Sequence, residues 1–234
     1  ISMKSGAKGV NKAIVTACAT SAHCIGDSLR TIQYGEADVI IAGGAEAVIT
    51  RLGIGAFTSA RTLSKRNDEP QKASRPYDVD RDGFVMAEGA AIVIVEELEH
   101  AKKRGAKIYA EIVGYGQTGD AYDIVAPDPT GQGAAKAMEF AVKDAGLKPS
   151  DVQYINSHGT STGLGDIAES KAIAQVFGDL STNKDLKVSS TKSMHGHMLG
   201  ATGAAESIVC VKVINEGIIP PTINLEHQDE HVAN

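Results

Sequence analysis

Cysteine is scarce in this sequence, and the cysteines present are not spaced as pairs. The 234 residues contain Cys18, Cys24 and Cys210, an odd number with no Cys-x-x-Cys motif. We therefore expect neither a disulfide framework nor a structural zinc site. This use of cysteine fits a reducing compartment and predicts a cytoplasmic location.

Tryptophan, a positive charge excess and long apolar runs are also missing. The formal net charge is -6, so a nucleic-acid partner has no global electrostatic support. No apolar run reaches membrane-spanning length and no signal peptide is visible, so no membrane role is expected. The first residue is Ile rather than Met, and the opening residues 1–6 are expected to be the interior of a longer chain. The length suffices for one full core or two small ones.

The stretch Thr16–Ser21 lies between an apolar, strand-like run at residues 13–15 and a strongly periodic segment. Apolar residues recur there at steps of four and three, which predicts a helix with one buried face; they are Cys18, Ala22, Ile25, Leu29 and Ile32. Gly35 stands where a helix C-cap is expected. A second apolar run at residues 39–42 predicts a strand, and residues 43–46 predict a tight turn.

This pattern places Cys18 after a strand and at the positive end of a helix. Unpaired backbone N–H groups and the helix dipole favour a thiolate at such a position, so Cys18 is a candidate nucleophile. From this stretch alone, a small buried core cysteine remains an equal alternative.

The rest of the chain alternates between helical and strand patterns. Residues 67–82 are proline- and charge-rich and predict a surface loop. The remaining segments predict strands at 90–95, 152–155 and 186–190, and helices at 96–104, 133–145, 167–177 and 203–215. Such alternation indicates an α/β fold with a mainly parallel sheet covered on both faces. A soft boundary near residue 105 divides the chain into 1–105 and 106–234.

Two further polar stretches follow directly after predicted strands. They are Asn156–Thr162 and Ser190–His197, which contain His158, Lys192 and His197. Open α/β sheets place their sites at the carboxyl edge of the strands. Three sets of reactive residues at one such edge favour an enzyme over a packing explanation.

These residue types narrow the chemistry. A thiolate at a helix start can accept an acyl group as a thioester, and two histidines could bind an oxyanion or relay protons. A nearby lysine would favour anionic forms in the same pocket. A zinc site at His195 and His197 is disfavoured, because no third ligand occurs at standard spacing. The Gly-x-Gly-x-x-Gly at residues 114–119 opens no predicted helix, so a dinucleotide is not expected.

The three stretches together resemble the condensing enzymes of fatty-acid synthesis. They match the active-site motifs of the type II β-ketoacyl-[acyl-carrier-protein] synthases, of the thiolase-like superfamily, in the same order. Further stretches agree as well: residues 74–78, 81–85, 99–106 and 220–224. The resemblance covers essentially the whole chain.

The resemblance implies a layered αβαβα fold of two similar halves, here incomplete at both ends, and a homodimer. It implies a ping-pong Claisen condensation without a cofactor, with acyl carrier protein as the partner. Cys18 would accept the acyl chain and provide half of an oxyanion hole through its N–H. His158 and His197 would assist decarboxylation of malonyl-carrier protein and stabilise the enolate. The other implied roles are charge and orientation by Lys192 paired with Glu169, pantetheine binding by Thr160 and Thr162, and lining of the acyl pocket by Phe57.

The sequence departs from the family pattern in a few places. His195 stands where the motif usually has Thr, and Gly163 stands where it usually has Pro. The family's opening strands and its glycine-rich gating loop fall outside this chain. We therefore expect that the isolated chain condenses poorly or not at all.

Carrier-protein contact is expected at Arg61, Lys65 and Arg66, whereas the basic run at residues 102–104 is expected to be an ordinary solvated surface. A polyketide ketosynthase uses the same Cys–His–His set and remains an alternative. A thiolase would need a second catalytic cysteine, and Cys210 lies in an apolar helical stretch that looks structural. A structural or binding module is the remaining alternative.

Overall fold

The computed structural model describes residues 1–179 and 183–232. These residues form two compact units, and each is made of segments far apart in the sequence. One unit comprises Ile1–Glu46, Gly89–Ile112 and Leu199–Glu216, and the other comprises Ala47–Glu88, Val113–Met198 and the residues from 217 onwards. The predicted boundary near residue 105 cuts the chain once, whereas these units are each made of several segments, so the boundary stays a prediction about the halves of a complete fold. No helix in the described ranges is both long enough and apolar enough to span a membrane.

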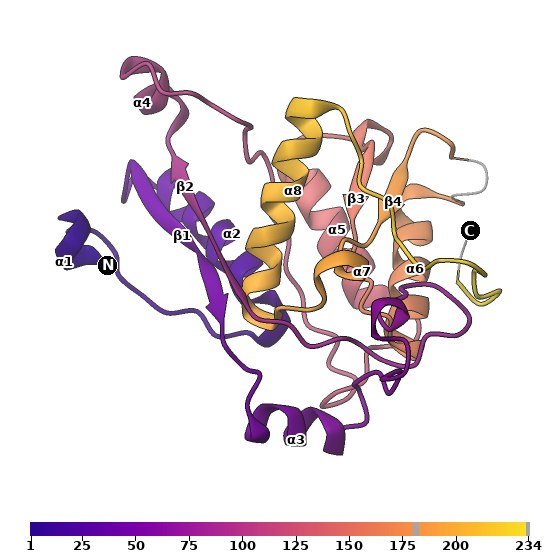
Figure 1. The fold of residues 1–234 in the computed structure, drawn as a ribbon. Coiled ribbons are helices and arrows are strands. Elements are labelled where there is room, and N and C mark those ends of the chain that lie inside the picture. Colours follow the sequence, from indigo (N-terminus) through magenta and orange to yellow (C-terminus); the bar gives the residue numbers. More distant parts are fainter. Residues whose placement is uncertain (180–182, 233–234) are drawn as a thin grey trace. The chain divides into compact units, whose positions relative to one another are not determined.

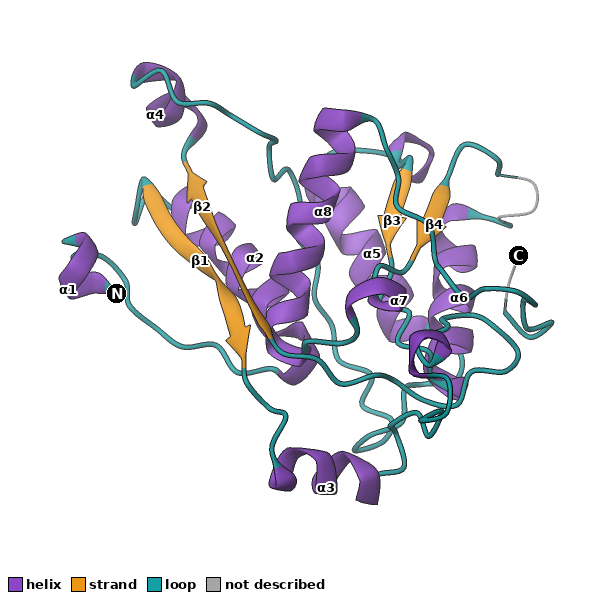
Figure 2. Cartoon of the chain, in the orientation of Figure 1, coloured by secondary structure: helices purple, strands orange, loops and turns teal. Residues whose placement is uncertain are grey.

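The first unit is built on an antiparallel pair of strands (Figures 1 and 2). Its elements are α1 (Ser2–Ser5), α2 (Thr20–Gln33), β1 (Val39–Glu46), β2 (Gly89–Glu96), α4 (Leu98–Lys103) and α8 (Thr202–Glu216). Helices α2 and α8 pack on β1, β2 and each other. The buried core between them consists of Ile25, Ala42, Ala91, Val95 and Ala204.

Helix α2 confirms the predicted periodic helix and its stop. The N–H of Gly35 bonds the carbonyl of Ile32, and the N–H of Glu36 bonds the carbonyl of Thr31. Gly35 has φ +73°, the left-handed geometry that a helix-ending glycine supplies. The expected strand at residues 13–15 is wrong, because these residues are irregular and β1 pairs only with β2 among the described strands.

The predicted tight turn at residues 43–46 is also wrong, because β1 continues through it. A Cβ on Gly43 would lie 2.1 Å from the carbonyl oxygen of Ala91, and one on Gly44 would lie 2.5 Å from that of Gly200. The glycines therefore permit close backbone approach within a strand rather than a change of direction.

The second unit contains the parallel strand pair. Its elements are α3 (Arg51–Ser59), α5 (Gln132–Asp144), β3 (Tyr154–Asn156), α6 (Gly163–Phe177), β4 (Lys187–Ser189) and α7 (Lys192–His195). Ile173 and Phe177 of α6 pack with Leu186 at the start of β4 to form the buried cluster, joined by apolar residues of α5. Among the described strands, β3 and β4 are parallel, as expected for a mainly parallel sheet, whereas β1 and β2 are antiparallel. Residues 47–88, which connect β1 to β2, belong to the second unit, so this connection is not a simple helical crossover.

The loop predicted at residues 67–82 is not wholly a surface loop, because residues 73–78 are buried. Asp78 is fully buried and accepts hydrogen bonds from the side chain of Arg75 and from the N–H groups of Asp80, Glu226 and His227. Burial alone would raise the Asp78 pKa, but these donors hold it well below its usual range. One carboxylate thus ties two distant segments together inside the protein.

Removal of that carboxylate is expected to be strongly destabilising. Asp78→Ala leaves the buried Arg75 guanidinium and three N–H groups without their acceptor, so we expect a loss of about 3–5 kcal/mol in the free energy of unfolding. Urea denaturation followed by circular dichroism measures it. Asp68→Ala, on the exposed part of the same loop, is the matched control and should stay within about 0.5 kcal/mol of the wild type. Equal losses in both variants would contradict the assignment.

Candidate active site

Cys18 lies in the first unit, in a 3-10 turn (Ala17–Ala19) that leads directly into α2. The hydroxyl of Thr20 caps this turn, because it donates to the carbonyl of Ala17 and accepts from the N–H of Thr16. Ala17 has φ +49°, a strained value for a residue with a side chain. The half-buried thiol therefore sits at a sharp, fixed bend at the positive end of a 14-residue helix, as the sequence predicted.

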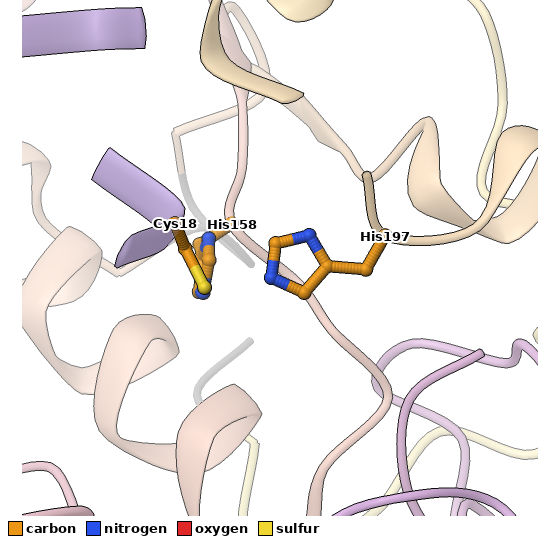
Figure 3. A group of neighbouring side chains, drawn as sticks. All are labelled: Cys18, His158 and His197. Carbon is orange, nitrogen blue, oxygen red and sulfur yellow. The ribbon is translucent and has the colours of Figure 1, made fainter. Parts of the chain in front are cut away.

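The second unit gathers His158, Lys192 and His197, which are far apart in the sequence. The imidazole rings of His158 and His197 meet edge to face, with centroids 5.3 Å apart and planes at 88° (Figure 3). Lys192 is 1 % exposed, and its Nζ lies 3.5 Å from the carbonyl oxygen of Ser157. The loops after β3 and β4 therefore bring these three residues together, as the sequence predicted.

Small hydroxyl residues hold these two loops together. The Ser190 hydroxyl donates to the carbonyl of Gly159 at 2.6 Å, and the Ser157 hydroxyl donates to that of Ser189. A Cβ on Gly159 would lie 2.6 Å from the Cβ of Ser190, and the backbone there has φ +29°. Glycine is required at this position for the loop carrying His158 to approach the loop carrying Lys192.

The Glu169 carboxylate holds the loop that carries His158 through hydrogen bonds. Its carboxylate accepts from the N–H groups of His158 and Gly159 at 2.6 and 2.7 Å, and from the Tyr77 hydroxyl at 3.0 Å. These bonds fix the peptide that carries the His158 ring. The predicted ion pair of Glu169 with Lys192 stays a prediction.

The electrostatics of the site favour neutral histidines. Burial first, and then the charge on Lys192, lower the pKa of His197 to about 3. The pKa of His158 is also well below its usual value, first because of desolvation, then because of Lys192 and His197. His158 keeps solvent-accessible surface while His197 is 2 % exposed, so the protein crowds the His158 ring without closing it off. Neutral imidazoles can donate an N–H to a developing oxyanion.

Phe84 is a residue of this site that sequence reasoning gave no role. Its ring packs edge-on against Phe57 at 5.3 Å and against His197 at 5.4 Å. The predicted pocket residue Phe57 is thus connected to the histidine pair through one buried aromatic side chain. A single apolar residue after Gly83 has no distinctive sequence pattern, so only the structure reveals that Phe84 packs against the site.

The other predicted residues are placed as follows. The hydroxyls of Thr160 and Thr162 lie 2.9 Å apart just before α6. Arg61 and Lys65 are exposed after α3, whereas the Arg66 guanidinium donates to the carbonyl of Asp80. The basic run at residues 102–104 forms surface ion pairs to Glu99 and Glu96, as an ordinary solvated face does.

Both ring nitrogens of His195 lie within hydrogen-bond distance of protein groups. Its Nδ1 is 2.7 Å from the carbonyl oxygen of Gly196 and its Nε2 is 3.1 Å from the Thr191 hydroxyl, so both ring nitrogens are occupied. Zinc chelation through His195 and His197 is therefore disfavoured by geometry as well as by spacing. The Gly-x-Gly-x-x-Gly at residues 114–119 is irregular, and the next helix, α5, begins only at Gln132, in agreement with the sequence argument.

Comparison with known proteins gives a consistent result. Residues 1–101 match the N-terminal domain of β-ketoacyl synthases, and residues 109–226 match the C-terminal domain. The chain is 56 % identical over 230 residues to 3-oxoacyl-[acyl-carrier-protein] synthase 2 of Coxiella burnetii, which covers 98 % of this chain and 55 % of the relative. It is 51 % identical to the mitochondrial 3-oxoacyl-[acyl-carrier-protein] synthase of Arabidopsis thaliana, covering 98 % of this chain and 50 % of that relative.

Solved structures agree with these sequences. A type II polyketide ketosynthase in complex with its acyl-carrier protein superposes with a TM-score of 0.95 at 40 % identity, over 99 % of this chain and 56 % of that one. A β-ketoacyl synthase from Burkholderia phymatum gives a TM-score of 0.88 at 41 % identity, over 93 % of this chain and 52 % of that one. The thiolase-like α/β fold is confirmed, and the chain spans about half the length of the relatives that it matches. On this combined evidence the chain belongs to the β-ketoacyl synthase family.

Proposed function

We propose that this chain supplies the nucleophile and the histidine pair of a 3-oxoacyl-[acyl-carrier-protein] synthase that elongates fatty acids. The observation that carries the proposal is the paired, neutral His158 and His197 beside buried Lys192. It is supported by the helix-start position of Cys18 and by family membership. The partner is acyl carrier protein, the working form is a homodimer, and the location is cytoplasmic.

The proposed reaction has two half-reactions. In the first, the Cys18 thiolate attacks the thioester carbonyl of acyl-carrier protein, and the carrier thiol leaves. In the second, malonyl-carrier protein loses carbon dioxide, and the resulting enolate carbon attacks the acyl-Cys18 carbonyl. The tetrahedral intermediate collapses, the Cys18 thiolate leaves, and a carbon–carbon bond has formed.

The histidines have a defined task in the second half-reaction. As neutral rings, His158 and His197 donate N–H to the malonyl thioester oxygen, where negative charge develops as carbon dioxide leaves. Desolvation first, and then charge repulsion from Lys192, keep both rings unprotonated, so they donate without adding a proton to the enolate. Thr160 and Thr162 bind the pantetheine arm, and Phe57 lines the acyl pocket.

A polyketide ketosynthase is the second candidate, because the ketosynthase that superposes at a TM-score of 0.95 belongs to that class. Relatives named 3-oxoacyl-[acyl-carrier-protein] synthase 2 match at higher identity, which favours fatty-acid elongation. Turnover of saturated acyl primers in preference to poly-β-keto primers discriminates the two.

Labelling of Cys18 tests the nucleophile directly. After incubation with an acyl-carrier protein or with cerulenin, intact mass should show a single adduct that is lost in Cys18→Ala. Cys24→Ala and Cys210→Ala are matched controls, since both thiols are half-buried on helices of the same unit, and both variants should keep the adduct. A folded wild-type chain that gains no adduct would contradict an activated thiol at Cys18 in this chain.

The low pKa of His197 predicts a pH-dependent stability. Below about pH 6.5 the unfolded chain takes up a proton at this residue, and the folded chain does so only near pH 3, so stability is lost as the pH falls through that window. His197→Gln removes the effect. The free energy of unfolding of the wild type should therefore fall relative to the variant by about 2 kcal/mol between pH 8 and pH 5. Parallel curves for the two proteins would show that His197 protonates normally.

Charge reversal tests the carrier-protein surface. Carrier proteins of this class are acidic, so Arg61→Glu with Lys65→Glu should weaken binding about tenfold at low salt and flatten its salt dependence. The control is Lys103→Glu, an exposed lysine of the run predicted to be ordinary surface. Fluorescence anisotropy with labelled carrier protein measures the binding of the double variant and of the control. A loss of binding in the control of the same size would place the contact elsewhere.

A further inference from the structure

His195 is the residue of the third motif that the proposed mechanism leaves without a role. It ends α7, the single helical turn that begins with Lys192, and it is half-buried. Its ring folds back over that turn to reach the Thr191 hydroxyl four residues earlier. Residues four apart on a helix are neighbours, so this contact is local and well defined.

The hydrogen-bond partners of the ring determine its tautomer. The Gly196 carbonyl oxygen, 2.7 Å from Nδ1, can only accept, so Nδ1 carries the hydrogen. In the neutral ring Nε2 is then an acceptor, and the Thr191 hydroxyl must donate to it. Burial lowers the pKa of His195 and the charge of Lys192 acts in the same direction; together they outweigh the opposing hydrogen bond to Gly196 and favour the neutral form.

The chain of hydrogen bonds continues into the neighbouring loop. The Asn156 side-chain amide also lies beside the Thr191 hydroxyl, with its nitrogen 3.3 Å and its oxygen 3.4 Å away. With the Thr191 hydrogen donated to His195, the hydroxyl oxygen accepts from the Asn156 amide nitrogen. Asn156 is the last residue of β3, and Ser157 and His158 follow it. The path therefore runs from His195 through Thr191 to Asn156, from the Lys192 turn to the base of the His158 loop.

We propose that His195 is a positioning residue that sets the spacing between the loop carrying Lys192 and the loop carrying His158. Through Nδ1 the ring bonds the Gly196 carbonyl at the end of α7, and through Nε2 it bonds Thr191, which contacts Asn156. A single hydroxyl oxygen cannot occupy the positions of both ring nitrogens. The catalytic meaning of this spacing depends on the proposed function, whereas the spacing itself is measurable without turnover.

Nuclear magnetic resonance of the 234-residue chain tests the proposal. In imidazole 15N spectra the His195 ring should show a protonated Nδ1 and an unprotonated Nε2. In His195→Ala the Asn156 side-chain amide protons should exchange with water about fivefold faster, the factor for one net hydrogen bond. The His158 ring signals should shift in the same variant. His195→Gln, whose amide oxygen can accept from Thr191, should restore both.

Two controls separate positioning from general loss of structure. His231→Gln changes an exposed histidine of the same unit and should leave the Asn156 and His158 signals unchanged. Thermal unfolding should show that the Ala and Gln variants at 195 remain folded at the temperature of the measurement. A protonated Nε2 on His195, or Asn156 exchange that is the same in wild type and His195→Ala, would overturn the proposal. Neither readout needs condensing activity, so a failure of the proposed function would be seen separately in the Cys18 adduct.

Discussion

The second unit depends on buried and half-buried carboxylates that accept hydrogen bonds from the backbone N–H groups of its loops. Asp78 holds residues 226 and 227 against the segment that contains Arg75, and Glu169 holds the peptide of His158 and Gly159. Loops have no ladder of their own to satisfy their N–H groups, so a buried loop requires acceptors of this kind. These carboxylates give irregular segments the rigidity that a catalytic side chain needs.

Arg81 and Asp166 complete this arrangement around the start of α6. The Arg81 guanidinium donates to the carbonyls of Thr162 and Gly163 and to the carboxylate of Asp229. Asp166 is fully buried, and its pKa is raised to about 6, mainly because burial disfavours its charge. The N–H of Tyr77 and the nearby Arg81 oppose that rise. The raised pKa shows that these partners offset only part of the cost of burying the Asp166 charge.

The same principle shapes the histidine pair. Burial first, and then the charge of Lys192, lower the pKa values of both rings, and the His197 ring packs against Phe84. An apolar wall and a fixed positive charge both disfavour protonation of the histidines. Chemistry in which negative charge develops on a substrate oxygen benefits from this arrangement, because donors that are already held in place need no reorganisation.

The sequence alone determined the periodic helix α2 and its glycine stop and the strands at β2 and β4, and it identified Cys18, His158, Lys192 and His197 as candidate site residues. These features are local, because periodicity, caps and motif order are properties of consecutive residues. Only the tertiary structure decided that Gly43 and Gly44 lie inside a strand, that residues 73–78 are buried, and that Phe84 joins Phe57 to His197. It likewise showed the hydrogen-bond partners of both ring nitrogens of His195. Those outcomes depend on which distant backbone or side chain approaches a residue, and no pattern of neighbouring residues contains that information.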